Sequence, residues 1–139
     1  MVLADEYGEP VFQPQMYHES RPASAEKIRE TVAYSDRPGW DLALLPTSPL
    51  PKILHLRETH PDRFSQVEWV LSPTTWLLYR LRYGSDTEWR NLETDWTNAL
   101  KFGTDITSPV PEWFESLFDA VDLPLSLFPT IRPPGTFIG

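Results

Sequence analysis

The sequence predicts an α/β domain in which a short sheet is packed with several helices. Its 139 residues are enough for one domain with a hydrophobic core, and 40% of them are apolar. Residues 1–4 and 67–71 have the apolar or alternating pattern of short strands. Residues 22–33, 49–59, 73–83 and 111–121 carry apolar side chains at helical spacing. Strand-like and helical segments therefore alternate along the chain.

Two of these helices have clear start signals. Ser48 precedes Pro49 and Ser72 precedes Pro73, which is the arrangement of an N-cap followed by the first helical position. Gly84 is expected to end the second helix as a C-terminal cap. Because the helix over residues 73–83 is apolar almost all round, we expect it to be sandwiched between layers.

The strand over residues 1–4 is expected to form a hairpin with residues 10–17. Residues 5–8 would make the turn, with Gly8 at positive φ. A two-stranded hairpin is only marginally stable, so further sheet partners are expected elsewhere. The proline-rich tail should be extended, with a closing strand over residues 136–139 that would also need a partner. Both ends therefore predict that residues 1–139 form a single partial domain.

Charge and composition argue against several classes of partner. The formal net charge is -8 and no basic cluster stands out, so neither nucleic acid nor an anionic membrane is an expected partner. The absence of cysteine excludes disulfides and thiolate metal sites, and it fits a reducing, cytoplasmic location. No run of about 18 apolar residues occurs, and no signal peptide is visible.

Common catalytic and metal-binding motifs are also missing from the sequence. It contains no glycine-rich loop of the nucleotide-binding types, no G-x-S-x-G elbow and no cysteine nucleophile. His55 and His60 are five residues apart, which does not place them on one helical face for metal binding. We therefore expect no metal site and no catalytic residue in this chain.

The stretch over residues 94–103 (TDWTNALKFG) is polar at its front, apolar behind and closed by glycine. Asp95, Thr97 and Asn98 can hydrogen-bond nearby backbone amides, as residues at a helix start or turn do. A buried Asp95 would have a raised pKa and could act as a base, whereas a helix-capping Asp95 would stay ionised. The local pattern favours the capped turn over a binding site, but leaves both open.

Read in order, five segments resemble the FGGY family of carbohydrate kinases, which includes relatives of xylulokinase, ribulokinase and glycerol kinase. Residues 2–10 (VLADEYGEP) resemble the family's vDxxGxP turn, and residues 16–21 (MYHESR) resemble its W-N-D-x-R segment. Residues 52–56 (KILHL) resemble K-l-x-W-l, and the helix over 76–81 (WLLYRL) follows. Residues 94–99 (TDWTNA) are similar to [ST]-D-x-x-N-A, and the spacing to 127–129 (LFP) also matches. The D-ribulose kinase, xylulokinase-like branch is the most similar.

The resemblance implies a partial ribonuclease-H-like domain of the actin-like ATPase superfamily. This would be the central part of the N-terminal, sugar-binding domain, without the phosphate loop and the catalytic Asp motif. The intact kinase would phosphorylate a pentulose-type sugar, D-ribulose or xylulose, using ATP and Mg²⁺. The chain would be inactive alone, with the sugar and the remainder of the kinase as partners, and no cofactor is expected for it alone.

The resemblance also assigns roles to individual residues. Tyr17 would pack on the sugar face, and His18 and Glu19 would hydrogen-bond hydroxyl groups. Asp95 and Asn98 would hold the turn beside the pocket rather than touch the sugar. Tyr17 stands where many members have Trp, and Glu19 stands where Asp is usual, so an ordinary strand-end aromatic describes Tyr17 equally well.

One alternative from a different class remains. The chain carries its own apolar core, so it is also compatible with a stand-alone, non-catalytic module that binds a sugar or another protein. Exposed sheet edges make self-association of the chain an expectation under either interpretation.

Overall fold

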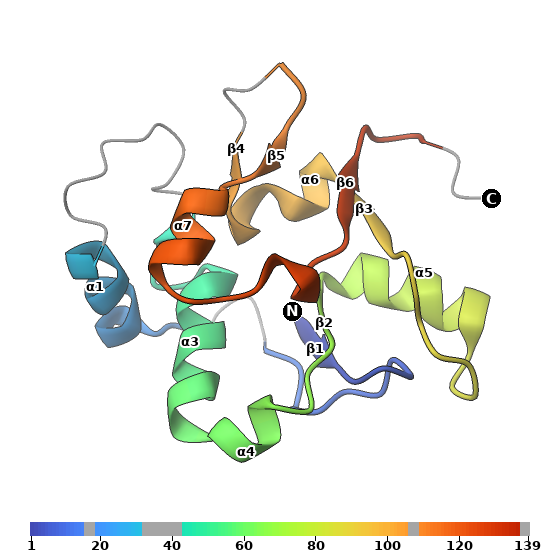
Figure 1. The fold of residues 1–139 in the computed structure, drawn as a ribbon, viewed down its shortest axis with the longest axis horizontal. Helices are drawn as coiled ribbons and strands as arrows, with labels where there is room; N and C mark the ends of the chain where they lie inside the picture. Colours follow the sequence, from blue (N-terminus) through green and yellow to red (C-terminus); the bar gives the residue numbers. More distant parts are fainter. Residues whose placement is uncertain (16–18, 32–42, 106–108, 137–139) are drawn as a thin grey trace.

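The structure, a computed structural model, describes residues 1–15, 19–31, 43–105 and 109–136 (Figure 1). It is a mixed domain of helices and small sheets, as the sequence predicts. In chain order the described elements are β1 (Val2–Ala4), α1 (Pro22–Thr31), α3 (Pro49–Thr59), α4 (Pro61–Phe64), β2 (Trp69–Leu71), α5 (Pro73–Tyr83), β3 (Glu93–Asp95), α6 (Trp96–Ala99), the 3-10 turn η1 (Leu100–Phe102), β4 (Thr104–Asp105), β5 (Glu112–Trp113), α7 (Glu115–Ala120), the 3-10 turn η2 (Leu125–Leu127) and β6 (Thr130–Arg132).

The described strands form separate pairs rather than one sheet. β1 lies antiparallel to β2, with Val2 opposite Leu71. β3 lies parallel to β6, with Glu93 opposite Thr130, and β4 lies antiparallel to β5. Segments far apart in the sequence are thus joined at the centre of the molecule (Figure 1).

The expected hairpin between residues 1–4 and 10–17 is present over its described part only as an isolated antiparallel bridge between Ala4 and Pro10. Residues 10–15 form no strand, although the Val11 amide donates to the Leu3 carbonyl at 2.8 Å. Pro10 and Pro14 lack amide hydrogens, so a regular ladder cannot continue along this segment. β1 pairs with β2 instead. The other strand expected in the tail, over residues 136–139, falls mostly outside the described residues.

The helices with serine–proline starts are confirmed. α3 and α5 begin at Pro49 and Pro73 and end at the residues that the sequence predicts. The Ser72 hydroxyl accepts a hydrogen bond from the Thr75 amide at 3.2 Å, and Gly84 ends α5 with a φ of +67°. α7 is shorter than expected, because residues 112–113 pair as β5.

Two apolar clusters form the interior. The larger one collects residues from β1, α1, α3, η1 and α7, including Ile28, Leu50, Ile53, Leu117 and Phe118. The smaller one packs α5 against β2 and the 84–92 segment through Leu71, Tyr79, Trp89 and Leu92. The expectation that α5 is sandwiched between layers is wrong, because one of its faces is exposed.

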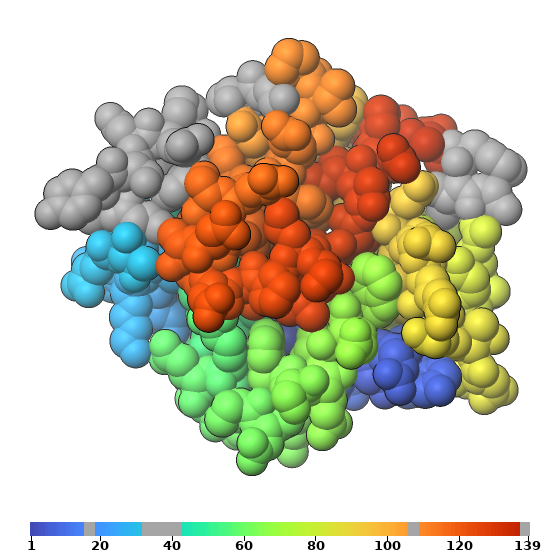
Figure 2. Space-filling view, in the orientation of Figure 1, coloured from blue at the N-terminus to red at the C-terminus, as the bar shows by residue number. Residues whose placement is uncertain are grey.

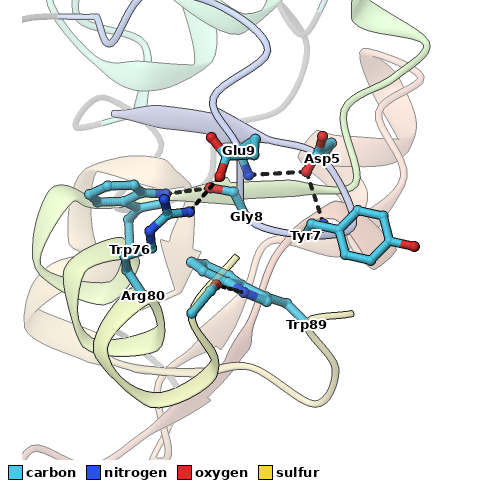
Figure 3. Close-up of polar contacts among 8 residues, drawn as sticks. Asp5, Tyr7, Gly8, Glu9, Trp76, Arg80 and Trp89 are labelled. Carbon is cyan, nitrogen blue, oxygen red and sulfur yellow. Dashed lines mark hydrogen bonds and ion pairs between the residues drawn. The ribbon is translucent and has the colours of Figure 1, made fainter. Parts of the chain in front are cut away.

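The turn over residues 5–9 is fixed by local hydrogen bonds (Figure 3). The Asp5 carboxylate accepts from the backbone amides of Tyr7 and Glu9, at 2.9 and 3.0 Å. Gly8 has a φ of +76°, and a Cβ atom there would lie 2.1 Å from the Trp89 ring. Glycine is therefore required at this position both for backbone conformation and for space, and the prediction for Gly8 is confirmed.

Candidate functional site

A largely apolar pocket of about 440 Å³, with a few polar groups in its wall, lies between the start of α3, the N-terminal segment and the α6–η1 turn. This volume is within the range of small-molecule sites in proteins. The pocket is lined by Met1, Gln15, Thr47, Pro49, Lys52, Pro73, Thr97, Asn98, Leu100, Lys101 and Phe102. We call it the α3–α6 pocket.

Lys52 is the most buried charged residue on the pocket wall. Only 3% of it is exposed, because the first turn of α3 packs against η1 and covers its aliphatic stem. Burial lowers the pKa of the Lys52 ammonium; Glu19 acts in the opposite direction, and Arg21 and Lys101 lower it further. Helical spacing places Lys52 on a different face of α3 from Leu50, Ile53 and Leu54, and the structure shows that this face is buried as well.

Glu19 contributes to the electrostatics of this pocket. Its carboxylate lies 3.9 Å from the Arg21 guanidinium and acts on Lys52 through its charge. Arg21 is anchored by its backbone amide, which donates to the Pro46 carbonyl at 2.8 Å. Glu19 therefore lies where a negative charge balances the buried Lys52.

The pocket wall also carries a polar atom that lacks a partner within the described part of the chain. Among the described residues, no group hydrogen-bonds Oε1 of Gln15, although the side-chain nitrogen of Gln15 donates to the Gln13 carbonyl at 3.1 Å. A buried acceptor of this kind is costly unless it is satisfied. Because this oxygen is buried, it is not an accessible acceptor on the pocket surface.

Asp95 caps α6 at the edge of the pocket. Its Oδ1 accepts from the Asn98 amide at 2.9 Å, and its Oδ2 accepts from the Asn98 side-chain nitrogen at 2.8 Å. Burial works to raise the pKa of Asp95, but the hydrogen bonds from Asn98 and Thr97 outweigh it, so this pKa lies below its ordinary value. Asp95 is therefore an ionised cap rather than a base, and the capped turn expected from the sequence is present.

The structure brings together only some of the residues assigned from the sequence. Asn98 lines the α3–α6 pocket, and Asp95 holds the turn from which it projects. Tyr17 and His18 lie outside the described residues. Lys52, Lys101 and Gln15 were missed as site residues; the signal that could have found Lys52 was the K-l-x-W-l segment, which begins with it.

Two other hollows lie elsewhere on the described part of the chain. One of about 530 Å³ is walled largely by apolar groups and proline, from Pro109 to Ile131. The other, beside Glu93, Asp95 and Arg132, holds only about 120 Å³.

The wall of the α3–α6 pocket combines a few polar groups with a mostly apolar surface. Its described lining offers ammonium, amide and hydroxyl groups but no carboxylate. Within residues 1–15, 19–31, 43–105 and 109–136, no group of three His, Cys, Asp or Glu could hold a metal ion. Among the helices of these same ranges, none has the length and apolar character to cross a membrane.

The architecture around this pocket is similar to part of two solved carbohydrate kinases. The chain superposes on xylulose kinase from Lactobacillus acidophilus with a TM-score of 0.72, over 97% of its own length and at 17% identity. Gluconate kinase from the same organism gives a TM-score of 0.71 over 99% of this chain, also at 17% identity. The predicted resemblance to FGGY-family carbohydrate kinases is therefore confirmed at the level of the fold.

The match covers only part of these enzymes. The chain spans about a quarter of their length, 26% of the xylulose kinase and 27% of the gluconate kinase. Comparison of the sequence with known families and with characterised proteins finds no match.

Proposed function

We propose that the chain forms one wall of the sugar-binding site of an FGGY-type carbohydrate kinase. The observation that carries this proposal is the α3–α6 pocket, with Lys52 buried in its wall, in a fold shared with two sugar kinases. The domain is then a partial ribonuclease-H-like domain of the actin-like ATPase superfamily, and the enzyme acts in the cytoplasm.

The proposed substrate is a pentulose such as D-ribulose or xylulose. In this scheme the Lys52 ammonium and the Asn98 amide donate to sugar hydroxyls. Glu19 keeps Lys52 charged and oriented. Tyr17 and His18 complete the wall, as the sequence resemblance implies.

Phosphoryl transfer is assigned to groups outside this chain. The intact kinase uses ATP as the phosphate donor. Mg²⁺ neutralises the charge of the transferring phosphate and positions it. The described residues do not fit that role, because they contain no carboxylate cluster for a metal. What this chain supplies is orientation of the sugar, which by itself accelerates such reactions.

Sugar binding by the isolated chain tests the proposal. D-ribulose, D-xylulose and glycerol are titrated against the chain and followed by ¹H–¹⁵N NMR shifts. The pentuloses should shift the amides around the pocket, and Lys52→Met should weaken that binding about tenfold or more, because an ammonium donor is lost from a buried wall. Lys27→Met, at an exposed lysine that pairs with Glu58 on α1 and α3, should leave it unchanged.

Failure would take one of two forms. An absence of pentulose-dependent shifts, or equal losses in the two lysine variants, would contradict the assignment of the pocket. Sugar phosphorylation by the isolated chain with Mg-ATP would contradict the assignment of catalysis elsewhere. One wall of a site is expected to bind sugar only weakly, so tight and specific binding without turnover would instead favour the second candidate, a stand-alone module.

A further inference from the structure

One face of α5 carries large apolar side chains that the described chain leaves exposed. Leu77, Leu78 and Leu81 are 53%, 43% and 79% exposed, and their spacing places them on one side of the helix. In Figure 2 the yellow-green atoms of α5 reach the outer edge of the molecule, beside the yellow 84–92 segment. We call these three residues the leucine face.

The orientation of α5 is fixed by polar contacts on its other sides. Thr75 Oγ1 lies 2.8 Å from Thr94 Oγ1 on β3, and both residues are buried. The Tyr79 hydroxyl accepts from the Glu93 amide at 2.7 Å. These bonds hold one side of the helix against β3, so the leucine face cannot turn inward without breaking them.

The N-terminal turn holds α5 from a second direction (Figure 3). The indole nitrogen of Trp76 donates to the Gly8 carbonyl at 2.8 Å. Nη1 of Arg80 lies 2.7 Å from Glu9 Oε1. α5 is thus a fixed helix that presents leucines outward, rather than a loosely attached one.

The strands beside α5 form a very small parallel sheet. β3 and β6 form a parallel pair, and no described strand adds to either of its edges. Parallel strands occur almost only inside sheets that are covered on both faces. Leu78 lines the same hollow as Glu93, Thr94 and Arg132, so the leucine face is continuous with the parallel pair. One partner could cover both.

A second copy of this chain is a poor occupant for this surface. Each copy carries a formal net charge of -8, which opposes association. Three partly exposed leucines also supply far less area than the roughly 800 Å² per partner of a stable interface. A segment of the same kinase needs less area, because linked or co-folded parts lose little additional freedom on packing.

We propose that the leucine face of α5 is the contact surface for the part of a sugar kinase that lies outside the quarter matched by this chain. The inference rests on the proposed function for the identity of the partner. The kinases that share the fold have about three-quarters of their length beyond the match. The partner surface is apolar, a strand or helix face that packs over Leu77 and Leu81.

The test places this chain in the context of such a kinase. The matched quarter of the Lactobacillus acidophilus xylulose kinase is replaced by these 139 residues, and a second chimaera uses the gluconate kinase. Amide hydrogen exchange of α5 is compared between each chimaera and the isolated chain. Exchange in α5 should slow by about tenfold or more in a chimaera, because burial against a partner suppresses local opening.

A double substitution, Leu77→Gln with Leu81→Gln, separates docking from intrinsic stability. It should remove the added protection in the chimaera and lower its melting temperature by several degrees, while the isolated chain melts as before. Val110→Gln is the matched control, because Val110 is also apolar and 65% exposed but lies far along the chain from α5. It should have no effect in either setting.

Several results would overturn the proposal. The first is that the amides of α5 exchange at the same rate in the chimaera and in the isolated chain. The second is that the double substitution lowers the melting temperature equally in both. The third is that neither chimaera folds. Concentration-dependent dimerisation of the isolated chain through α5 would assign the face to a second copy instead. Sugar phosphorylation by the chimaera is scored separately: a protected α5 without sugar binding removes the proposed function and keeps the docking surface.

Discussion

Gly8 lies against the Trp89 indole with a φ of +76°, at the point where the N-terminal turn meets the 84–92 segment. Trp89 is almost fully buried and donates its indole N–H to the Gly84 carbonyl at 3.0 Å. Its own amide donates to the Glu6 carbonyl at 2.7 Å. The ring is therefore held from several sides and cannot move away to admit a side chain at position 8.

Gly8→Ala should destabilise the chain by about 2–5 kcal/mol, combining left-handed backbone strain with overpacking against a held ring. Gly84→Ala is the control, because Gly84 has a similar φ of +67° but open space where its Cβ would stand. Its ψ of -148° lies close to a region that is essentially confined to glycine, so the loss there should be about 1–3 kcal/mol of backbone strain alone. Urea unfolding of both variants measures the difference, and equal losses would show that Trp89 relaxes.

Lys52 shows what sequence reasoning misses at this scale. Helical periodicity assigns faces by spacing alone, and a lysine two residues from Leu50 and Leu54 falls on a different face. In the structure the start of α3 is enclosed by η1 and the N-terminal segment, so even this face is buried there. That enclosure depends on contacts between residues about 50 apart in the sequence. The spacing of apolar residues within one helix cannot predict such contacts.

Among the elements, α6 depends most clearly on a single side chain. Asp95 supplies the acceptors for Asn98 at its start, and the resulting hydrogen bonds place the pKa of Asp95 below its ordinary value of 3.8. A carboxylate with a depressed pKa stabilises the folded state above its ordinary pKa. That contribution is lost as the pH falls through the lower, folded-state pKa.

Asp95→Ala should therefore cost about 1 kcal/mol near neutral pH, the usual value of an N-cap. The difference from the parent chain should shrink as the pH falls below about 3.8, because the parent then loses the same cap. Asp119→Ala removes an exposed carboxylate on α7 and serves as the control. Unfolding free energies across acidic pH would contradict this account if the Asp95 difference stayed constant.

Elements with local start signals were predictable, and those that depend on distant partners were not. α3 and α5 are marked by Ser48–Pro49 and Ser72–Pro73, so their bounds follow from neighbouring residues. The parallel pair of β3 and β6 joins residues 93–95 to 130–132. Neither segment has an alternation of apolar and polar residues strong enough to predict a strand. The exposed leucine face was also missed, because apolar residues all round a helix do not reveal which side lacks a neighbour.

At the scale of the whole molecule, α3 is tied to the C-terminal third of the chain by one guanidinium. Nη1 of Arg57 donates to the Asp122 carbonyl at 2.6 Å, and Nη2 donates to the Val121 carbonyl at 2.8 Å. Val121 ends α7 and is buried in the larger cluster. The two hydrogen bonds of the Arg57 guanidinium therefore hold the C-terminal end of α7 against α3.

Arg57→Lys should cost about 1–2 kcal/mol, because an ammonium keeps the charge but cannot reach both carbonyls in the same plane. Arg90→Lys is the matched control, since Arg90 is exposed and pairs only locally with Glu88 among the contacts described. Chemical denaturation should show no change for it. Equal behaviour of the two variants would mean that the Arg57 contacts add nothing to the closure of α7.

The pairing of β1 with β2 has a consequence for biosynthesis. Leu71, the partner of Val2, is made 69 residues after it. At translation rates of about 5–20 residues per second the first strand stays unpaired for several seconds. β3 waits in the same way for residues 130–132. Helices of the nascent chain can therefore form at once, whereas the edges of β1 and β3 stay unpaired and exposed to aggregation until their partner strands have been made.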